Sequence, residues 1–254
     1  PFLMGIVFSF TKYRTIVDFE FTGFQNYVIA FGKGSTFWHA LGVSVYFVIV
    51  TVLIINVGAY LIALLLTKSL KGTSFFRSLF FMPNLIGGIV LGYIWQLLLN
   101  AIYSLWGQTL TSNFNNGFWG LVILTCWQQI GYMMVIYIAA ISAVPEDVLE
   151  SAKIDGASRT MTTLKITIPM TMPSITICLF MTLTNGFKLF DQNLALNGYT
   201  SPDNMLLAMD IYNTMFNSSG NNMGPGQAKS VVFFLLVMLV SWTQLRATRQ
   251  KEVE

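Results

Sequence analysis

Long apolar stretches separated by short polar segments run through the whole sequence. Four stretches contain no Asp, Glu, Lys or Arg, namely residues 34–67, 78–145, 166–187 and 230–245. A helix of about 20 apolar residues is enough to cross the hydrocarbon core of a bilayer. The pattern therefore predicts several membrane-spanning helices.

These stretches predict an all-α polytopic membrane protein with about six transmembrane helices. We expect the helices at about residues 1–10, 39–66, 75–99, 118–144, 169–187 and 228–245. The first is too short to span and has no initiator Met, so we expect its N-terminal half to be missing from this numbering. Polar segments are expected at 11–37, 100–116, 146–168 and 191–227, the last with a short amphipathic helix over 204–216.

Composition agrees with a membrane protein and excludes several functions. Hydrophobic residues make up 54% of the 254 residues and charged residues only 10%, against roughly 25% charged in soluble domains. The mean hydropathy of +0.63 excludes a soluble globular enzyme. A net charge of +3 is too small for a nucleic-acid partner. Cys126, Cys178 and the single histidine, His39, offer no disulfide framework, metal site or catalytic triad.

Basic residues are distributed unequally between the two sides of the predicted membrane. Nine fall on the side that carries residues 146–168 and the C-terminus, and five on the other. The nine are Lys68, Lys71, Arg77, Lys153, Arg159, Lys165, Arg246, Arg249 and Lys251. Cytoplasmic loops are enriched in Lys and Arg, so we expect this loop and the C-terminus to be cytoplasmic.

The charged loop is itself patterned like a short helix. Pro145 suits a first helical position, and Glu146 and Asp147 complement the positive end of a helix dipole. Gly156 allows a left-handed turn that ends the helix, and Ser158 can cap the next one. The alternative is a surface loop that is simply solvated by its own charges.

The residues of this loop match a known motif. Glu150-Ser151-Ala152, Asp155-Gly156-Ala157 and Ile166-Thr167-Ile168-Pro169 resemble the EAA signature of ABC-importer permeases, with Ser151 and Ile168 as departures from Ala and Leu. The resemblance extends over nearly the whole chain and is to carbohydrate-uptake permeases of the maltose-transporter type. It implies a single transmembrane permease domain over residues 1–254, with a cytoplasmic coupling loop over 145–169.

The resemblance implies a subunit of a larger assembly in the bacterial plasma membrane. Expected partners are a second homologous permease, two cytoplasmic ATPases, an extracellular solute-binding protein and membrane lipid. ATP and Mg²⁺ would bind to the ATPases, and this chain would carry no cofactor, metal or catalytic residue. Its Gly32-Lys33-Gly34-Ser35 lacks the first glycine of a phosphate-binding loop.

The same resemblance gives roles to the loop residues. Glu150 would be the charged contact with the ATPase, Ala152 and Gly156 close-approach surfaces, and Asp155 a brace for the turn. Ser151, Ile166 and Pro169 complete the expected coupling set.

Polar side chains within apolar spans are candidates for solute contact, because they are costly unless they face a wet cavity or the bundle interior. Gln128, Gln129, Tyr132, Asn185 and Lys188 are such residues. Alignment on the resembling family adds Asn84 and Gly88, and only Tyr132 and Asn185 match the family by residue type. The alternative for the amides and Tyr132 is hydrogen bonding between helices.

Two further alternatives stay open among these candidates. Gly88 and Gly92 have the spacing of a close helix-packing pair. Lys188 either pairs with Asp191, extends to the membrane interface or contacts the solute.

The amides favour a neutral oligosaccharide as the solute, since amides both donate to and accept from hydroxyls. If Lys188 faces the solute, glycerol 3-phosphate or a related anion is the alternative. A freestanding secondary transporter or channel is disfavoured because the predicted spans contain no coupling carboxylate.

Overall fold

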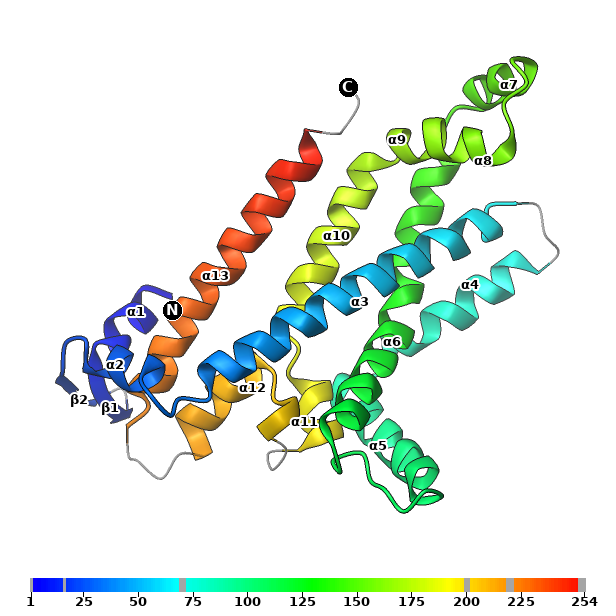
Figure 1. The fold of residues 1–254 in the computed structure, drawn as a ribbon. Helices are drawn as coiled ribbons and strands as arrows, with labels where there is room; N and C mark the ends of the chain where they lie inside the picture. The colour runs from blue at the N-terminus through cyan, green and yellow to red at the C-terminus, as the bar shows by residue number, and fades with distance from the viewer. Residues whose placement is uncertain (1, 16, 69–71, 199–201, 218–221, 251–254) are drawn as a thin grey trace. The chain divides into compact units, whose positions relative to one another are not determined.

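The computed structural model describes residues 2–15, 17–68, 72–198, 202–217 and 222–250. Pro1, and Lys71 and Lys251 from the charge comparison, lie outside these ranges. Helices dominate the described residues (Figure 1).

Three helices are long and apolar enough to cross a membrane. They are α3 (Phe37–Leu66), α6 (Phe114–Ser142) and α13 (Gly224–Arg249). Two bent helix pairs pass the same test, which raises the number of candidate spans within the described residues to five. These spans confirm the prediction of a helical polytopic membrane protein, and α1 (Phe2–Ser9), with eight residues, is not one of them.

The expected single helix over residues 75–99 is wrong, because the chain is broken near its middle. Helix α4 (Thr73–Phe81) leads into a 3₁₀ turn, η1 (Met82–Leu85), and α5 (Gly88–Ser104) follows. Pro83 has no backbone N–H to donate, and Ile86 is extended with φ −88° and ψ 130°. The span therefore contains irregular backbone, whose polar groups need partners.

The fifth expected helix is also interrupted. Residues 159–170 form α8 (Arg159–Thr162), a π-helical turn η2 (Thr163–Thr167) and α9 (Ile168–Met170), before α10 (Met172–Phe187). The two parts are bent by 72° at Thr171, which lies between Pro169 and Pro173. A proline at the second position of α10 has no backbone N–H to donate to the preceding turn, which accounts for the bend.

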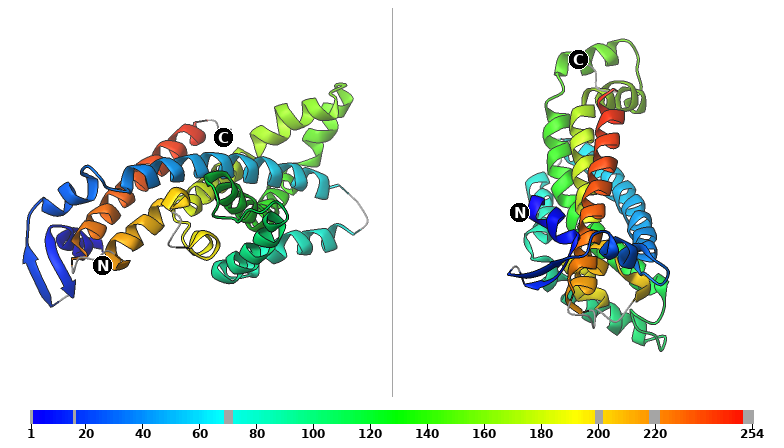
Figure 2. Two further views of the ribbon diagram at one scale, coloured as in Figure 1. Left: turned by 60° about the horizontal axis from the view of Figure 1, so that its bottom comes forward. Right: turned by 90° about the vertical axis from the view of Figure 1, so that its left-hand side faces the viewer.

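The N-terminal segment expected as a loop contains regular structure. Strands β1 (Thr11–Thr15) and β2 (Asp18–Phe21) pair antiparallel, with Thr11 opposite Phe21, and α2 (Gln25–Phe31) follows (Figure 2, dark blue). The Asn26 amide donates to the carbonyl oxygens of Ser9 and Thr11 at 2.9 and 2.8 Å. A buried side chain thus connects α2 to α1 and β1, a contact that local patterning does not reveal.

The segment after α10 is largely helical as well. It contains α11 (Asp191–Asn197), η3 (Pro202–Asn204), α12 (Leu207–Tyr212) and a π-helical turn η4 (Asn213–Asn217). The amphipathic helix expected over 204–216 is confirmed in part, because α12 begins only at Leu207. Leu207 and Ile211 pack with Phe37 and Ala40 of α3 in a buried cluster.

The Cα positions divide the chain into two compact units. Unit 1 comprises Pro1–Ile49, Gly88–Val122 and Asn185–Val240, and unit 2 comprises Val50–Gly87, Ile123–Thr184 and Ser241–Glu254. Helices α3, α6, α10 and α13 each continue from one unit into the other.

Interhelical hydrogen bonds hold unit 2 together. Tyr137 of α6 donates to Asn56 of α3 at 2.7 Å, and the Asn56 amide donates to Thr182 of α10 at 2.9 Å. A Cβ at Gly131 of α6 would overlap the backbone of Phe80, so only glycine permits this close helix approach. Cys126 and Cys178 are buried in the same unit.

Candidate functional site

The loop between α6 and α10 lies in unit 2 and folds as the sequence predicts. Helix α7 (Glu146–Ile154) begins after Pro145, which takes the N-cap rather than the expected first helical position. Glu146 and Asp147 occupy the first turn and Lys153 the last, so charge at both ends complements the helix dipole. Figure 1 shows α7 beyond the ends of α6 and α9.

A Schellman turn ends α7 and redirects the chain. Gly156 has a φ of +78°, a left-handed conformation that side chains disfavour. The Ala157 N–H donates to the Ala152 carbonyl at 2.9 Å, and the Gly156 N–H to the Lys153 carbonyl at 3.1 Å, which is the paired pattern of this motif. Ser158 then caps α8 by accepting from the Met161 N–H at 3.3 Å.

The loop residues of the motif differ in exposure. Glu150, Asp155 and Gly156 are exposed, and Ile166 and Pro169 are half-buried. Ala152 is buried against the chain's own loop, and the Ser151 hydroxyl donates to the Asp147 carbonyl at 2.8 Å. Ile154 is 86% exposed, so the apolar residues of α7 do not form one buried stripe.

A groove of about 330 Å³ separates α7 from the segment that follows it. Val148, Ser151 and Ala152 line one side, and Met161 and Ile166 the other. Ala152 and Ile166 therefore both line this groove, while the side of α7 that carries the exposed Glu150 remains available to another molecule.

Four candidate solute residues lie in unit 2. The buried Gln128 amide of α6 donates to the Ile86 carbonyl at 3.2 Å, so it satisfies backbone that the break after α4 leaves without a helical partner. Gln129 is half-buried, and its side-chain oxygen has no hydrogen-bond partner among the described residues. Asn84 lies half-buried in η1, and Tyr132 is half-buried, with its ring centroid 6.4 Å from that of Phe81.

The other three candidates lie in unit 1. A Cβ on Gly88 would come within 2.9 Å of the Gln192 side chain, and one on Gly92 within 2.6 Å of the Ala195 Cβ. The two glycines therefore allow α5 to pack closely against α11, as their spacing indicates. Gly88 serves packing in this structure.

Asn185 and Lys188 both have exposed side chains near the end of α10. The alternative in which Lys188 pairs with Asp191 is wrong, because no ion pair joins these two described residues. The exposed side chains of Asn185 and Lys188 are therefore available to another molecule.

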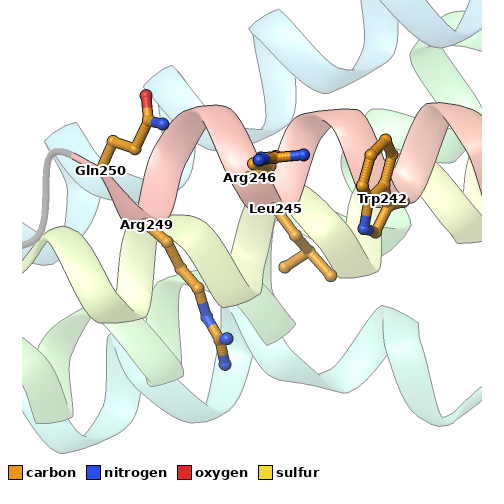
Figure 3. A pocket seen from close by; sticks show the side chains of 5 residues that line it. All are labelled: Trp242, Leu245, Arg246, Arg249 and Gln250. Carbon is orange, nitrogen blue, oxygen red and sulfur yellow. The ribbon is translucent and has the colours of Figure 1, made fainter.

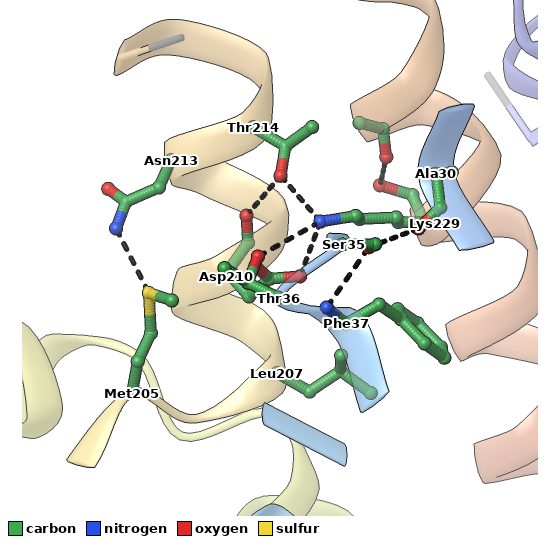
Figure 4. Close-up of polar contacts among 12 residues, drawn as sticks. Ala30, Ser35, Thr36, Phe37, Met205, Leu207, Asp210, Asn213, Thr214 and Lys229 are labelled. Carbon is green, nitrogen blue, oxygen red and sulfur yellow. Dashed lines mark hydrogen bonds and ion pairs between the residues drawn. The ribbon is translucent and has the colours of Figure 1, made fainter. Parts of the chain in front are cut away.

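Sequence reasoning missed a buried ion pair in unit 1 (Figure 4). Lys229 of α13 contacts the Asp210 carboxylate of α12 at 2.8 Å, and the two side chains are 4% and 1% exposed. The Lys229 ammonium also donates to Thr214 at 2.8 Å, and the Thr36 hydroxyl donates to Asp210. Asp210 and Lys229 are 19 residues apart in the sequence and meet only when the chain folds. The one signal in the sequence was a lysine near the start of an apolar helix.

The apolar helices, the broken spans and the structured charged loop define the class as a polytopic membrane transport protein. The sequence profile of the family described as "binding-protein-dependent transport system inner membrane component" matches residues 59–250. The chain belongs to this family and is therefore a permease subunit of an ABC importer in the inner membrane.

Relatives and solved structures support the assignment. The chain is 40% identical to the probable starch degradation products transport system permease protein AmyD of Thermoanaerobacterium thermosulfurigenes, over 100% of this chain and 89% of AmyD. It is 28% identical to the multiple sugar-binding transport system permease protein MsmF of Streptococcus mutans, over 100% and 90%. A bacterial ABC transporter involved in alginate import has a similar fold, with a TM-score of 0.80 at 18% identity over 98% of this chain and 88% of that one.

Membership of the family shows which step of transport this subunit carries out and which step its partners carry out. The chain is a transport subunit and not an enzyme, and partner ATPases hydrolyse the ATP. The family description also makes it part of a complex that works with a binding protein.

Proposed function

We propose that this permease imports a neutral oligosaccharide. Its 40% identical relative is described as transporting starch degradation products, and MsmF as part of a sugar transport system. Gln129 supports the same solute class, because its side-chain oxygen is buried without a hydrogen-bond partner among the described residues, and a sugar hydroxyl could donate to it. Asn84, Tyr132 and Asn185 add an amide, a phenol and a second amide of suitable chemistry.

The structure favours some contacts of the expected set over others. Gln128 is engaged with the Ile86 carbonyl and Gly88 with helix packing, so both act by shaping the backbone around the solute. We assign direct contact with the solute to Gln129, Tyr132 and Asn185, because their polar groups are engaged neither in bonding to the backbone, as in Gln128, nor in helix packing, as at Gly88.

We further propose that α7 docks on a cytoplasmic ATPase. The observation that carries this proposal is the geometry of the loop: a Schellman turn and a capped second helix fix α7, while Glu150 and Asp155 remain exposed. Glu150 is the charged contact, and Ile154 supplies apolar area on the same exposed helix. Closure of the ATPases on ATP would move α7 and, through α6 and α9, the membrane helices.

The proposed assembly contains a second homologous permease, two ATPases and an extracellular solute-binding protein. In the proposed orientation the C-terminus is cytoplasmic, because the excess of Lys and Arg lies on that side.

A matched pair of variants tests the coupling proposal. Glu150→Ala should leave the complex assembled but lower ATP-driven uptake by about tenfold relative to ATP hydrolysis, because a charged contact worth about 1.4 kcal/mol is lost. Glu146→Ala removes an exposed carboxylate from the same helix, outside the motif, and is the control. Equal uptake per ATP in the two variants would reject a coupling role for Glu150.

Uptake into vesicles that contain the complete transporter tests the solute. We expect ATP-dependent uptake of maltooligosaccharides, reduced at least tenfold by Gln129→Leu combined with Asn185→Leu. Gln25→Leu removes an exposed amide from α2 and should have no effect. Unchanged uptake in the double variant would exclude these side chains from the solute path.

One observation favours a second solute class. Lys188 is exposed and makes no ion pair with Asp191, so its charge is available to an anion such as glycerol 3-phosphate. Preference for that anion over oligosaccharide, abolished by Lys188→Met, would replace the sugar proposal while leaving the coupling proposal intact.

A further inference from the structure

A cavity of about 590 Å³ lies in unit 2, between the last turns of α3 and the loop that holds α7. This volume is within the range of small-molecule sites in proteins, which is about 300–1,000 Å³. Neither the solute candidates nor the exposed face of α7 contributes to it, except through Lys153.

One wall of the cavity is apolar and belongs to a candidate membrane span. Leu61, Leu64 and Leu65 of α3 share one face of the helix, and Leu149 of α7 lies opposite. Leu61 and Leu65 are 56% and 54% exposed. The wall is therefore continuous with the surface that α3 offers to hydrocarbon.

The polar rim of the cavity carries charge of one sign. Lys68, Lys153 and Arg159 line it, and none of its lining residues is acidic. All three cations are exposed, and none forms an ion pair with a described carboxylate. The Thr163 hydroxyl next to them donates to the Arg159 carbonyl at 3.0 Å, so its oxygen remains able to accept.

We propose that this cavity binds an anionic phospholipid. The phosphate lies against Lys68, Lys153 and Arg159, and an acyl chain follows Leu61 and Leu65 along α3. A guanidinium suits phosphate because it donates two parallel hydrogen bonds, and basic residues at a membrane surface attract anionic lipid. A free phosphate ion would use the cations but would leave the leucine wall without a role.

A lipid in this position has a mechanical consequence. Lys68 follows α3, Lys153 belongs to α7 and Arg159 begins α8, so one headgroup connects a membrane span to both sides of the Schellman turn. The bound lipid would hold α7 in its position relative to α3. Lipid charge would therefore influence the stiffness of the loop without touching the solute path.

Another hollow in unit 2 provides the control. It is lined by Trp242, Leu245, Arg246 and Arg249 from the end of α13 and by Gln250, which follows the helix (Figure 3). Arg246 lies over the Trp242 ring at 5.3 Å, and the described lining includes no second helix that would form an apolar wall. Arg246 and Arg249 therefore offer charge without the second feature of the proposed site.

Native mass spectrometry of the complete transporter tests the proposal. The complex is equilibrated with equal amounts of phosphatidylglycerol and phosphatidylcholine, and the retained lipids are counted. We expect at least tenfold preference for phosphatidylglycerol, lost when Lys68, Lys153 and Arg159 are all changed to Gln. The control changes Lys165, Arg246 and Arg249 to Gln, removes the same charge and should keep the preference.

A second variant tests the acyl-chain contact and remains informative if the triple variant fails to assemble. Leu65→Trp fills the apolar wall and should reduce retention of long-chain phosphatidylglycerol but not of its dihexanoyl form. Equal loss in the triple variant and its control, no retained phosphatidylglycerol in the wild-type complex, or displacement of the lipid by millimolar inorganic phosphate would each overturn the proposal. The second of these results would indicate that a partner subunit covers the cavity.

Discussion

The buried pair of Lys229 and Asp210 offers a direct test of how unit 1 is held together. In Lys229→Met the apolar part of the side chain is largely kept, but the ammonium that contacts Asp210 and Thr214 is removed. The Asp210 carboxylate, 1% exposed, then retains the Thr36 hydroxyl as a donor but has no cation. The variant therefore leaves a negative charge buried without compensation.

The expected cost follows from this burial. Removing one partner of a buried ion pair typically costs about 3–5 kcal/mol, whereas replacing both partners by neutral groups is often close to neutral. We therefore expect Lys229→Met to lower stability by about 3–5 kcal/mol and the double variant with Asp210→Asn to recover at least half of that loss. Lys188→Met removes an exposed lysine and should cost less than about 0.5 kcal/mol.

Thermal unfolding of the detergent-solubilised complex, followed by size-exclusion chromatography, measures these differences. For domains of this size about 1 kcal/mol corresponds to about 2–4 °C in Tm, so Lys229→Met should lose at least about 6 °C. The reasoning fails if Lys229→Met has the same Tm as Lys188→Met, or if adding Asp210→Asn lowers the Tm further. The second result would mean that the carboxylate stabilises unit 1 even without its lysine.

Three further predictions concern unit 2 and the orientation of the chain. Gly131→Ala should cost several kcal/mol in thermal unfolding because its Cβ overlaps backbone, while Gly42→Ala in open space should be neutral or stabilising. Gly156→Val should reduce uptake strongly and Gly156→Asn only weakly, because Asn tolerates positive φ; equal loss would instead indicate close approach of a partner. A cysteine that replaces exposed Lys153 should react with an impermeant maleimide from the cytoplasmic side, and one that replaces exposed Lys188 should react from the outside. The two native cysteines are buried and should contribute little background labelling. Labelling of both variants from the same side would refute the topology.

Local signals in the sequence predicted the charged loop well. The ends of α7, the left-handed Gly156 and the Ser158 cap were all expected, because each depends on interactions within about six residues of chain. The bend between Pro169 and Pro173 is likewise local in origin, because neither proline has a backbone N–H to donate. The break after Pro83 was not, although the proline was visible, because a single apolar stretch covers both halves.

The candidate solute residues show where sequence reasoning ends. Composition identified Gln128 and Gln129 equally as polar groups in a span, yet only the fold shows that Gln128 is engaged by Ile86 and that Gln129 keeps a free oxygen. Gly88 was a candidate by alignment, and the approach of α11 shows that its small size serves packing.

The sequence by itself determined that this chain is a helical membrane permease, where the three unbroken spans of the described residues lie and how its loop turns. Hydropathy, prolines, glycines and helix caps act on neighbouring residues, so their effects can be predicted from the sequence alone. Only the tertiary structure decided that Lys229 meets Asp210, that α11 packs on Gly88, and that a cavity rimmed by three cations opens beside α3. These features depend on the register between helices distant in the chain, which shape complementarity and buried charge fix only when the helices pack.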